Sequence, residues 1–376
     1  MSAERVKGFE TTCSKHSGAT GGESNMTDKP AYALGVEIGG TKLQIGLGTL
    51  DSETIEQLWR ADIDATQGAE RIRTQIAQGV DELLKPRGLQ HGDVAGMGIG
   101  FGGPVDADRG CTMTSHQVAG WDDFPIVDWA AKTLGIPGIL QNDADTAALA
   151  EAHYGAGRGF DPVFYITVGS GIGGGLILGG QVYRGSGRGA AEIGHLRPGN
   201  VPRHLPYPGT TVEQIASGFG ITQRARQAIA DHTAAASFAA AHRTAAAPDM
   251  IAQAEPSAPA SRLLELTGND PEKITTKHIA TAAAAGDPFC RGLLNDATDT
   301  LGWAIAQVVT LVNPARIVIG GGVSLMGDTL FFEPVGAAYR KHVFAPFADV
   351  AQIVPAALGE EVVIHGALAL ARDAFS

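Results

Sequence analysis

The chain alternates short apolar runs with glycine-rich turns. In the segment AYALGVEIGGTKLQIGLG, β-forming residues lead into Gly39-Gly40-Thr41, and a second apolar run, Leu43 to Leu47, follows at once. The segment PVFYITVGSGIGGGLILGG repeats this order around a turn that begins at Gly169. Both patterns predict two strands joined by a glycine turn.

Helical patterns separate these apolar runs. Apolar residues recur at helical spacing over about 68–84, in the Ala-rich segment after Asn142, and in LGWAIAQVVTLV. The C-terminal VVIHGALALARDAF is expected to form an amphipathic helix. Short strands are expected in VAGMGIGF, over 136–140 and in ARIVIG. This alternation of strands and helices predicts an α/β protein.

Length and charge restrict the class of protein. A chain of 376 residues exceeds one average domain, which favours two lobes. Hydrophobic residues make up 44% and charged residues 18%, and no apolar run approaches the ~20 residues of a membrane span. The net charge of −12 argues against nucleic-acid binding, because phosphate contacts need clustered Lys and Arg. We therefore expect neither a nucleic acid nor a membrane as a partner.

Cysteine usage and the N-terminal residues bear on location. Cys13, Cys111 and Cys290 are widely separated and odd in number, so they predict neither a disulfide framework nor a thiolate metal site. The reducing cytoplasm is the expected location. Residues 1–30 are polar and lack the apolar segment of a secretory signal, so we expect a disordered tail, with Met26 as a candidate alternative start.

Three glycine turns follow predicted buried strands and are candidates for phosphate binding. Glycine allows backbone N–H groups to approach an anion closely. One such turn often only closes a hairpin, whereas three together, with Thr and Ser among them, favour a nucleotide site. The candidate residues are Gly39, Gly40, Thr41, Lys42, Gly169, Ser170, Gly171, Gly173, Gly320, Gly321 and Gly322.

Two matches to the pattern G-x-G-x-x-G, over 98–103 and 169–174, have the wrong context for a dinucleotide site. The fingerprint must open a helix, but Pro104 follows the first match and strand-like residues follow the second. The P-loop pattern does not occur. The nucleotide site is therefore of another type.

The pair Asn142-Asp143 stands between a predicted strand and a predicted helix. Asn and Asp are common there as helix N-caps. A carboxylate at a strand end can also accept the proton of a hydroxyl group that attacks a phosphoryl group. Cap and base can be different residues of the same turn, so both interpretations stay open.

Seven segments, in this order, resemble the ROK family (repressor, open reading frame, kinase), which includes bacterial sugar kinases. They are VEIGGTK, GGPVD, NDADTAALAE, TVGSGIGGG, EIGH, VEQIASG and NPARIVIGGGVS, and they extend from about Tyr32 to the C-terminal region. The resemblance implies a two-lobed α/β fold of the actin-like, hexokinase-like ATPase type, which is related to ribonuclease H. It implies a small lobe of residues 31–141 plus 360–376 and a large lobe of residues 142–359. Residues of about 224–262, rich in Ala and Pro, are expected to be a helical insertion without a chemical role.

The same resemblance implies an activity. The expected reaction is ATP-dependent phosphorylation of a hexose with Asp143 as general base, glucose being preferred over fructose, mannose and N-acetylhexosamines. Asn142, Asp143, Glu192, His195 and Glu213 are similar to residues that bind sugar hydroxyls. Mg²⁺ is expected to bridge the ATP phosphates, polyphosphate is the alternative donor, and a homodimer is the expected assembly.

Two positions depart from the family pattern. Glu37 stands where most members have Asp, but its carboxylate can still contact Mg²⁺ or its waters. The cysteines of the usual zinc loop fall on about His204, Pro206 and Thr211, so we expect no structural zinc. We hypothesise that Pro198, Pro202, Pro206 and Pro208 partly replace the constraint that the metal places on Glu213.

Two other functions are open at this point. Family members that regulate transcription carry a DNA-binding winged helix ahead of the first glycine turn. Here only about thirty polar residues precede that turn, and they lack helical periodicity, which favours the kinase. A sugar-binding protein that has lost catalysis is the other alternative, motivated by Glu37 and the missing zinc ligands.

Overall fold

The computed structural model describes residues 31–115, 117–186, 189–199, 210–242 and 261–376, with the side chains of 233–242 and 261 left out. The predicted tail 1–30 with Met26, the zinc-loop positions His204 and Pro206, and Pro202 and Pro208 lie outside these residues.

The first sheet has the strand order β3-β2-β1-β4-β7. The pairs β1–β2 and β2–β3 are antiparallel, whereas β1–β4 and β4–β7 are parallel. The strands are β1 (Tyr32–Ile38), β2 (Lys42–Thr49), β3 (Gln57–Asp62), β4 (Val94–Phe101) and β7 (Gly138–Asn142).

The second sheet repeats this topology, with the order β10-β9-β8-β11-β12. Its first two pairings are antiparallel and its last two are parallel. The strands are β8 (Val163–Val168), β9 (Ile172–Leu178), β10 (Gln181–Val182), β11 (Arg316–Gly320) and β12 (Gln352–Pro355). The predicted hairpins therefore occupy equivalent places in the two sheets, and each ends in a glycine turn. A short pair, β5 (Val105–Asp106) with β6 (Cys111–Thr112), stands apart from both sheets.

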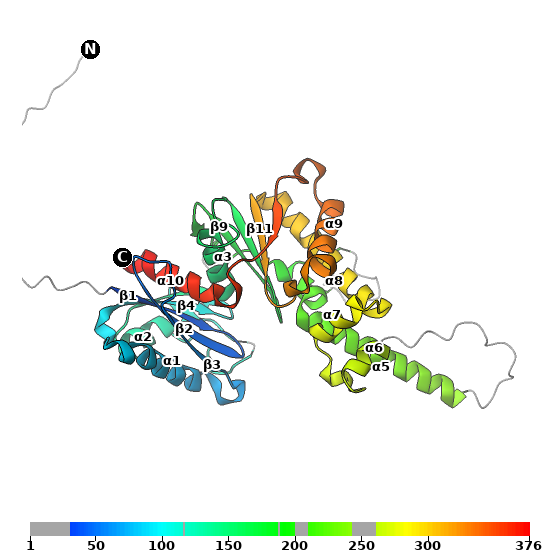
Figure 1. Cartoon of the computed structure of the whole chain (residues 1–376), viewed down its shortest axis with the longest axis horizontal. Helices are drawn as coiled ribbons and strands as arrows, with labels where there is room; N and C mark the ends of the chain where they lie inside the picture. Colours follow the sequence, from blue (N-terminus) through cyan, green and yellow to red (C-terminus); the bar gives the residue numbers. More distant parts are fainter. Residues whose placement is uncertain (1–30, 116, 187–188, 200–209, 243–260) are drawn as a thin grey trace, which may run out of the picture.

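Helices cover the faces of both sheets (Figure 1). Helices α1 and α2 pack on the first sheet, α8 and α9 pack against each other beside the second sheet, and α3 and α10 pack together between the two. The helices are α1 (Gly68–Leu84), α2 (Ile126–Thr133), α3 (Asp143–His153), α4 (Val212–Ala216), α5 (Gly218–His242), α6 (Ser261–Leu266), α7 (Thr276–Ala284), α8 (Pro288–Val312), α9 (Glu333–His342) and α10 (Val362–Phe375).

Helix α10 lies unusually close to its neighbours because glycines line the contact. A Cβ atom on Gly98 of β4 would lie 1.9 Å from the carbonyl oxygen of Ala367, and one on Gly366 would lie 1.9 Å from that of Thr146 in α3. These distances forbid any side chain. Gly98 therefore serves packing, which agrees with the exclusion of 98–103 as a dinucleotide fingerprint. The predicted amphipathic character is wrong, since α10 is buried from Val363 to Arg372 except at the half-buried His365.

The predicted strand over 136–140 is shifted by two residues. Pairing between β7 and β4 begins at Gly138, opposite Met97. Pro137 has no N–H group to donate, and its carbonyl accepts the first bond, from the backbone N–H of Met97 at 2.9 Å. The shift places Asn142 at the end of β7. The helix predicted over 68–84 is confirmed as α1.

Two sheets of equal topology agree with a two-lobed α/β protein. The residue boundaries proposed for the lobes stay a prediction. Helix α5 begins at Gly218, before the expected start of the insertion near residue 224. Among the helices that the structure describes, none combines the length and apolar character that a membrane crossing requires.

Candidate active site

A cleft of about 1100 Å³ brings the three glycine turns together. From the first turn it is lined by Thr41 and Lys42, from the second by Gly169 and Ser170, and from the third by Gly322. These turns are more than a hundred residues apart in the sequence. Their convergence supports the interpretation that they form one phosphate-binding site.

Glu37 lies at the end of β1, with its carboxylate in the cleft. Its Oε2 atom accepts a hydrogen bond from Nε2 of Gln44 at 2.6 Å and lies 3.7 Å from Nζ of Lys42. Burial raises the pKa of the Glu37 carboxyl, and the charge of Lys42 and the bond from Gln44 oppose that rise. A carboxylate therefore stands directly beside the first glycine turn.

The second glycine turn is bound to the start of α5 and to Glu213. The carbonyls of Gly169 and Ser170 accept the backbone N–H groups of Gly218 and Phe219 at 2.8 and 3.2 Å. Oε2 of Glu213 accepts the N–H of Ile172, the first residue of β9, at 2.8 Å. Glu213 is thus fixed against the turn by a direct bond.

A capping box also orients Glu213. The hydroxyl of Thr211 accepts the N–H of Gln214 at 3.2 Å, and Oε1 of Gln214 accepts the N–H of Thr211 at 2.9 Å. This box begins α4, whose second residue is Glu213. A local cap and the bond to Ile172 therefore constrain Glu213 within the described part of the chain. The hypothesis that prolines provide the constraint concerns mainly residues that the structure does not describe.

The third turn requires glycine at position 321. Gly321 has φ +87°, and a Cβ atom there would lie 2.6 Å from the carbonyl carbon of Val168. Two residues further on, the N–H of Val323 donates to the Val168 carbonyl at 2.9 Å. The third turn is therefore in direct contact with the end of β8, immediately before the second turn. Gly320 is the last residue of β11, and Gly173 pairs within β9, so these two candidates lie in strands beside the turns.

Asn142 and Asp143 separate the two roles that the sequence left open. Asn142 is the N-cap of α3, because its Oδ1 accepts the N–H of Ala144 at 2.9 Å and its Nδ2 donates to the carbonyl of Gly103 at 3.0 Å. Asp143 is the first residue of α3, and its Oδ1 accepts the N–H of Ala144 at 2.8 Å. The cap is therefore Asn142, and the carboxylate of Asp143 is not needed as the cap.

Asp143 lies among other carboxylates. A Cβ atom on Gly102 would lie 3.4 Å from Oδ2 of Asp143, which places this oxygen at the end of β4. Burial, and to a smaller degree the charges of Glu37 and Glu192, raise the pKa of Asp143 to about 6. A carboxyl group with this pKa is poised to exchange a proton near neutral pH.

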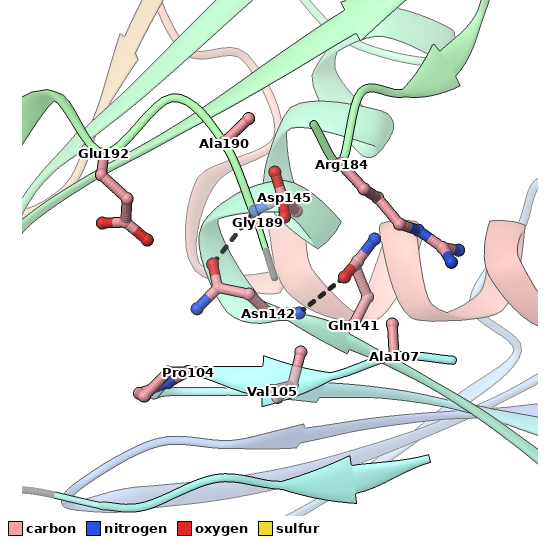
Figure 2. Close-up of a pocket in the computed structure, with 10 residues that line it drawn as sticks. All are labelled: Pro104, Val105, Ala107, Gln141, Asn142, Asp145, Arg184, Gly189, Ala190 and Glu192. Atoms are coloured by element: carbon pink, nitrogen blue, oxygen red, sulfur yellow. Dashed lines mark hydrogen bonds between the residues drawn. The ribbon is translucent and has the colours of Figure 1, made fainter. Parts of the chain in front are cut away.

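A second, smaller pocket of about 20 Å³ lies beside Asn142 and Glu192 (Figure 2). Glu192 is the N-cap residue of a 3₁₀ turn that ends at His195, and both side chains are exposed. Asp145 and Gln141 also line this pocket. The predicted sugar residues Asn142 and Glu192 therefore share one pocket, and the charge of Glu192 acts on Asp143.

The structure adds cleft residues that the sequence did not single out. Phe219 is 65% exposed at the start of α5, and Leu325 follows the third glycine turn. Arg226 lies within the segment expected to be a helical insertion without a chemical role, and it lines the cleft and donates to the carbonyl of Ile274 at 3.1 Å. The other cleft residues outside the predicted set are Gly218, Thr222, Gln223, Ile274, Thr275, Thr276, Lys277, Ala280, Val323 and Met326.

Only the proximity of Phe219 and Arg226 to the motif VEQIASG could have indicated these residues in advance. Within the ranges that the structure describes, no three His, Cys, Asp or Glu side chains are grouped in a way that could hold a metal ion by themselves.

Sugar kinases are among the known proteins whose sequences are similar to this chain. The profile of the ROK family matches residues 33–374. A glucokinase of Halalkalibacterium halodurans is 30% identical over 344 residues, which cover 91% of this chain and 94% of that protein. A glucokinase of Thermotoga maritima is 28% identical over 342 residues, covering 90% of this chain and 97% of that protein.

Solved structures agree. A ROK family glucokinase from Streptomyces griseus, in complex with glucose and AMPPNP, is 30% identical and superposes with a TM-score of 0.70. The match covers 91% of this chain and 99% of that one. The expected two-lobed, actin-like and hexokinase-like ATPase fold is confirmed.

Proposed function

The chain belongs to the ROK family and is an ATP-dependent sugar kinase, and we propose that its substrate is glucose and that Asp143 is its general base. The position of Asp143 is the observation that carries this proposal. The side chain lies where the ends of β4 and β7 meet. The charges of Glu37 in the large cleft and of Glu192 in the small pocket both raise its pKa. A base that deprotonates a sugar hydroxyl in front of a phosphoryl group must stand between the two substrates.

In this proposal, some residues of the chain bind the sugar and another accepts its proton. Asn142, Glu192, His195 and Glu213 bind hydroxyl groups of the sugar and present one of them, most simply the 6-hydroxyl, to Asp143. Asp143 accepts the proton as the hydroxyl oxygen bonds to the γ-phosphorus of ATP. The bond from that phosphorus to the β–γ bridging oxygen breaks, and ADP leaves.

The glycine turns hold the triphosphate in this scheme. Backbone N–H groups of the turns at Gly39 and Gly169 can donate to phosphate oxygens, and Thr41 and Ser170 add hydroxyl groups. Phe219 and Leu325 provide apolar surface in the same cleft, which suits the adenine ring.

Glu37 fits the magnesium ion that accompanies ATP. Mg²⁺ in such sites takes one or two carboxylates together with phosphate oxygens and water. The Glu37 carboxylate is half-buried and oriented by Gln44, so it can contact the ion or its waters. When bound, Mg²⁺ neutralises charge on the phosphates as the phosphoryl group moves.

A coupled assay for ADP with MgATP and a panel of hexoses tests the substrate. Glucose should give the highest kcat/KM among glucose, fructose, mannose, N-acetylglucosamine and N-acetylmannosamine. Direct measurement of the sugar phosphate with polyphosphate in place of ATP tests the donor, and light scattering coupled to size exclusion tests the expected homodimer. Absence of turnover on every sugar would overturn the assignment of glucose.

The base is tested by Asp143→Asn. We expect kcat to fall about 10²–10⁴-fold while the affinity for glucose, measured by calorimetry, is largely kept. Asp128→Asn is the matched control, because Asp128 also lies in the first turn of a helix but is 65% exposed on its side chain. Turnover at the wild-type rate in Asp143→Asn would exclude this residue as the base.

A further inference from the structure

Two buried polar side chains in the small pocket have an atom without a hydrogen-bond partner. Asp145 is 3% exposed and its Oδ1 is unpaired, and Gln141 is 2% exposed and its Nε2 is unpaired. Buried polar atoms are nearly always paired, and leaving one unpaired costs roughly 1–3 kcal/mol. One acceptor and one donor left open in the same pocket therefore indicate a ligand that bonds to both.

The pocket adjoins the residues assigned to the sugar. In Figure 2, Glu192 and Arg184 flank it from opposite sides, with Asp145, Gln141 and Asn142 between them. Gln141 is held in place because its Oε1 accepts the N–H of Asn142 at 3.2 Å, which leaves only its Nε2 to face a ligand. A sugar that contacts Asn142 and Glu192 thus has the pocket directly beside it.

Size and charge restrict what the pocket can take. Its volume of about 20 Å³ suits one group of the size of a water molecule, since a water needs at least about 10–15 Å³. An acetamido group has four heavy atoms and does not fit. Burial and the charges of Glu192 and Asp143 raise the pKa of Asp145 to about 7, against the opposing charge of Arg184. The Oδ1 atom of Asp145 has no donor among the described residues, so a ligand that donates a hydrogen bond would pair it.

We propose that Asp145 and Gln141 determine sugar specificity by binding one hydroxyl group of the hexose, Asp145 as acceptor and Gln141 as donor. A hydroxyl group is the sugar substituent that both donates and accepts and has the size of a water. A deoxy sugar would leave both side chains unpaired, and sites that bond a substrate hydroxyl reject such analogues strongly. This inference rests on the proposed function, because Asn142 and Glu192 contact a sugar only if the site binds a hexose.

The test combines Asp145→Ala with sugars that each lack one hydroxyl. For wild type and variant, kcat/KM is measured on glucose and on its 1-, 2-, 3- and 4-deoxy derivatives. We expect the variant to lose about 10- to 100-fold on glucose, mainly through KM. On the one deoxy sugar that lacks the bound hydroxyl, wild type and variant should be equal within about twofold.

Two further variants serve as controls for the role of Asp145. Asp128→Ala, which removes an exposed carboxylate from the first turn of α2, should leave every ratio unchanged. Asp145→Asn keeps the size and one acceptor oxygen, so its loss on glucose should be smaller than that of Asp145→Ala. Thermal melting establishes that each variant is folded, and removal of a buried carboxylate with an unpaired oxygen should not lower the melting temperature.

The failures are distinguishable. An equal loss on glucose and on all deoxy sugars, or no loss on glucose, would overturn the specificity role while leaving the kinase assignment intact. That result is also the one expected if the pocket only holds a permanent water. A wild-type protein that phosphorylates no sugar would overturn the glucose proposal and this inference together.

Discussion

Glu151 near the end of α3 is a buried carboxylate that connects two segments passing between the sheets. It is 0% exposed, and its Oε1 accepts the N–H groups of Ala357 and Leu358, both at 2.9 Å. Its Oε2 accepts the N–H of Ala156 at 2.7 Å. Ala357 and Leu358 lie between β12 of the second sheet and α10, which packs on the first sheet. Glu151 thus ties α3 to the segment that leads into α10.

The substitution Glu151→Ala should destabilise the protein strongly. Hydrogen bonds to a charged group contribute roughly 1.5–3 kcal/mol each, but such contributions are not additive, and the exposed Ala357 can bond to water instead. We therefore expect a loss of about 3–5 kcal/mol in the free energy of unfolding, which includes the cavity left by the side chain. Glu151→Gln, which keeps one acceptor oxygen, should lose roughly half as much.

Urea unfolding followed by circular dichroism measures this effect. Glu265→Ala is the control, because Glu265 is exposed on α6, and such changes usually stay within about 0.5 kcal/mol. The midpoint should move while the slope stays constant, since the unfolded surface is the same. A loss below about 1 kcal/mol for Glu151→Ala would refute the reasoning, because it would mean that the three bonds contribute no net stability.

Four further predictions concern the site. For the wild-type enzyme, kcat/KM should fall about tenfold per pH unit below about 6, because the raised pKa of Asp143 lies there and the base acts only when deprotonated; a profile flat down to pH 5 would contradict this. Glu37→Gln should raise the Mg²⁺ concentration for half-maximal rate roughly tenfold at fixed ATP, and an unchanged titration would argue against a role of Glu37 at the ion. Phe219→Ala should raise KM for ATP about five- to tenfold with KM for glucose unchanged, and equal changes in both would place Phe219 outside the adenine site. Metal analysis of chelator-washed protein should find far less than one zinc per chain, whereas stoichiometric zinc would contradict the expectation drawn from the missing cysteines.

The periodic parts of the fold were predictable from the sequence because local patterns determine them. The hairpins around Gly39 and Gly169 and the helix over 68–84 appear as expected. The equal topology of the two sheets was not predicted, since it depends on which distant strands pair. The wrong prediction that α10 is amphipathic also arises because contacts between distant segments decide its burial. Its apolar residues follow the pattern of one helix face, and part of what allows its close packing, such as Gly98 of β4, lies on other elements.

Residues of the candidate site were predictable where the residue type and its neighbours in the sequence together indicate a chemical role. Glycine turns after strands and the Asn142-Asp143 pair were visible in this way. Phe219 and Arg226 were not, because an aromatic ring and a cation on a long Ala-rich helix have no local signal. Only the three-dimensional contact between the start of α5 and the second glycine turn brings them to the cleft.

Three acidic residues of α3 lie in different surroundings, which the sequence of the helix alone does not reveal. Asp143, Asp145 and Glu151 are all carboxylates on one Ala-rich segment, and helix propensity and charge pattern treat them alike. Their surroundings separate them. Asp143 is buried within range of the charges of Glu37 and Glu192, Asp145 faces a pocket with an unpaired oxygen, and Glu151 accepts hydrogen bonds from three backbone N–H groups. A carboxylate whose two oxygens both accept hydrogen bonds contributes stability, whereas one with an unpaired oxygen can still bind a ligand or accept a proton. The two substitutions should therefore affect the free energy of unfolding differently. Glu151→Ala should lower it, whereas Asp145→Ala should leave it unchanged or raise it while lowering turnover of glucose.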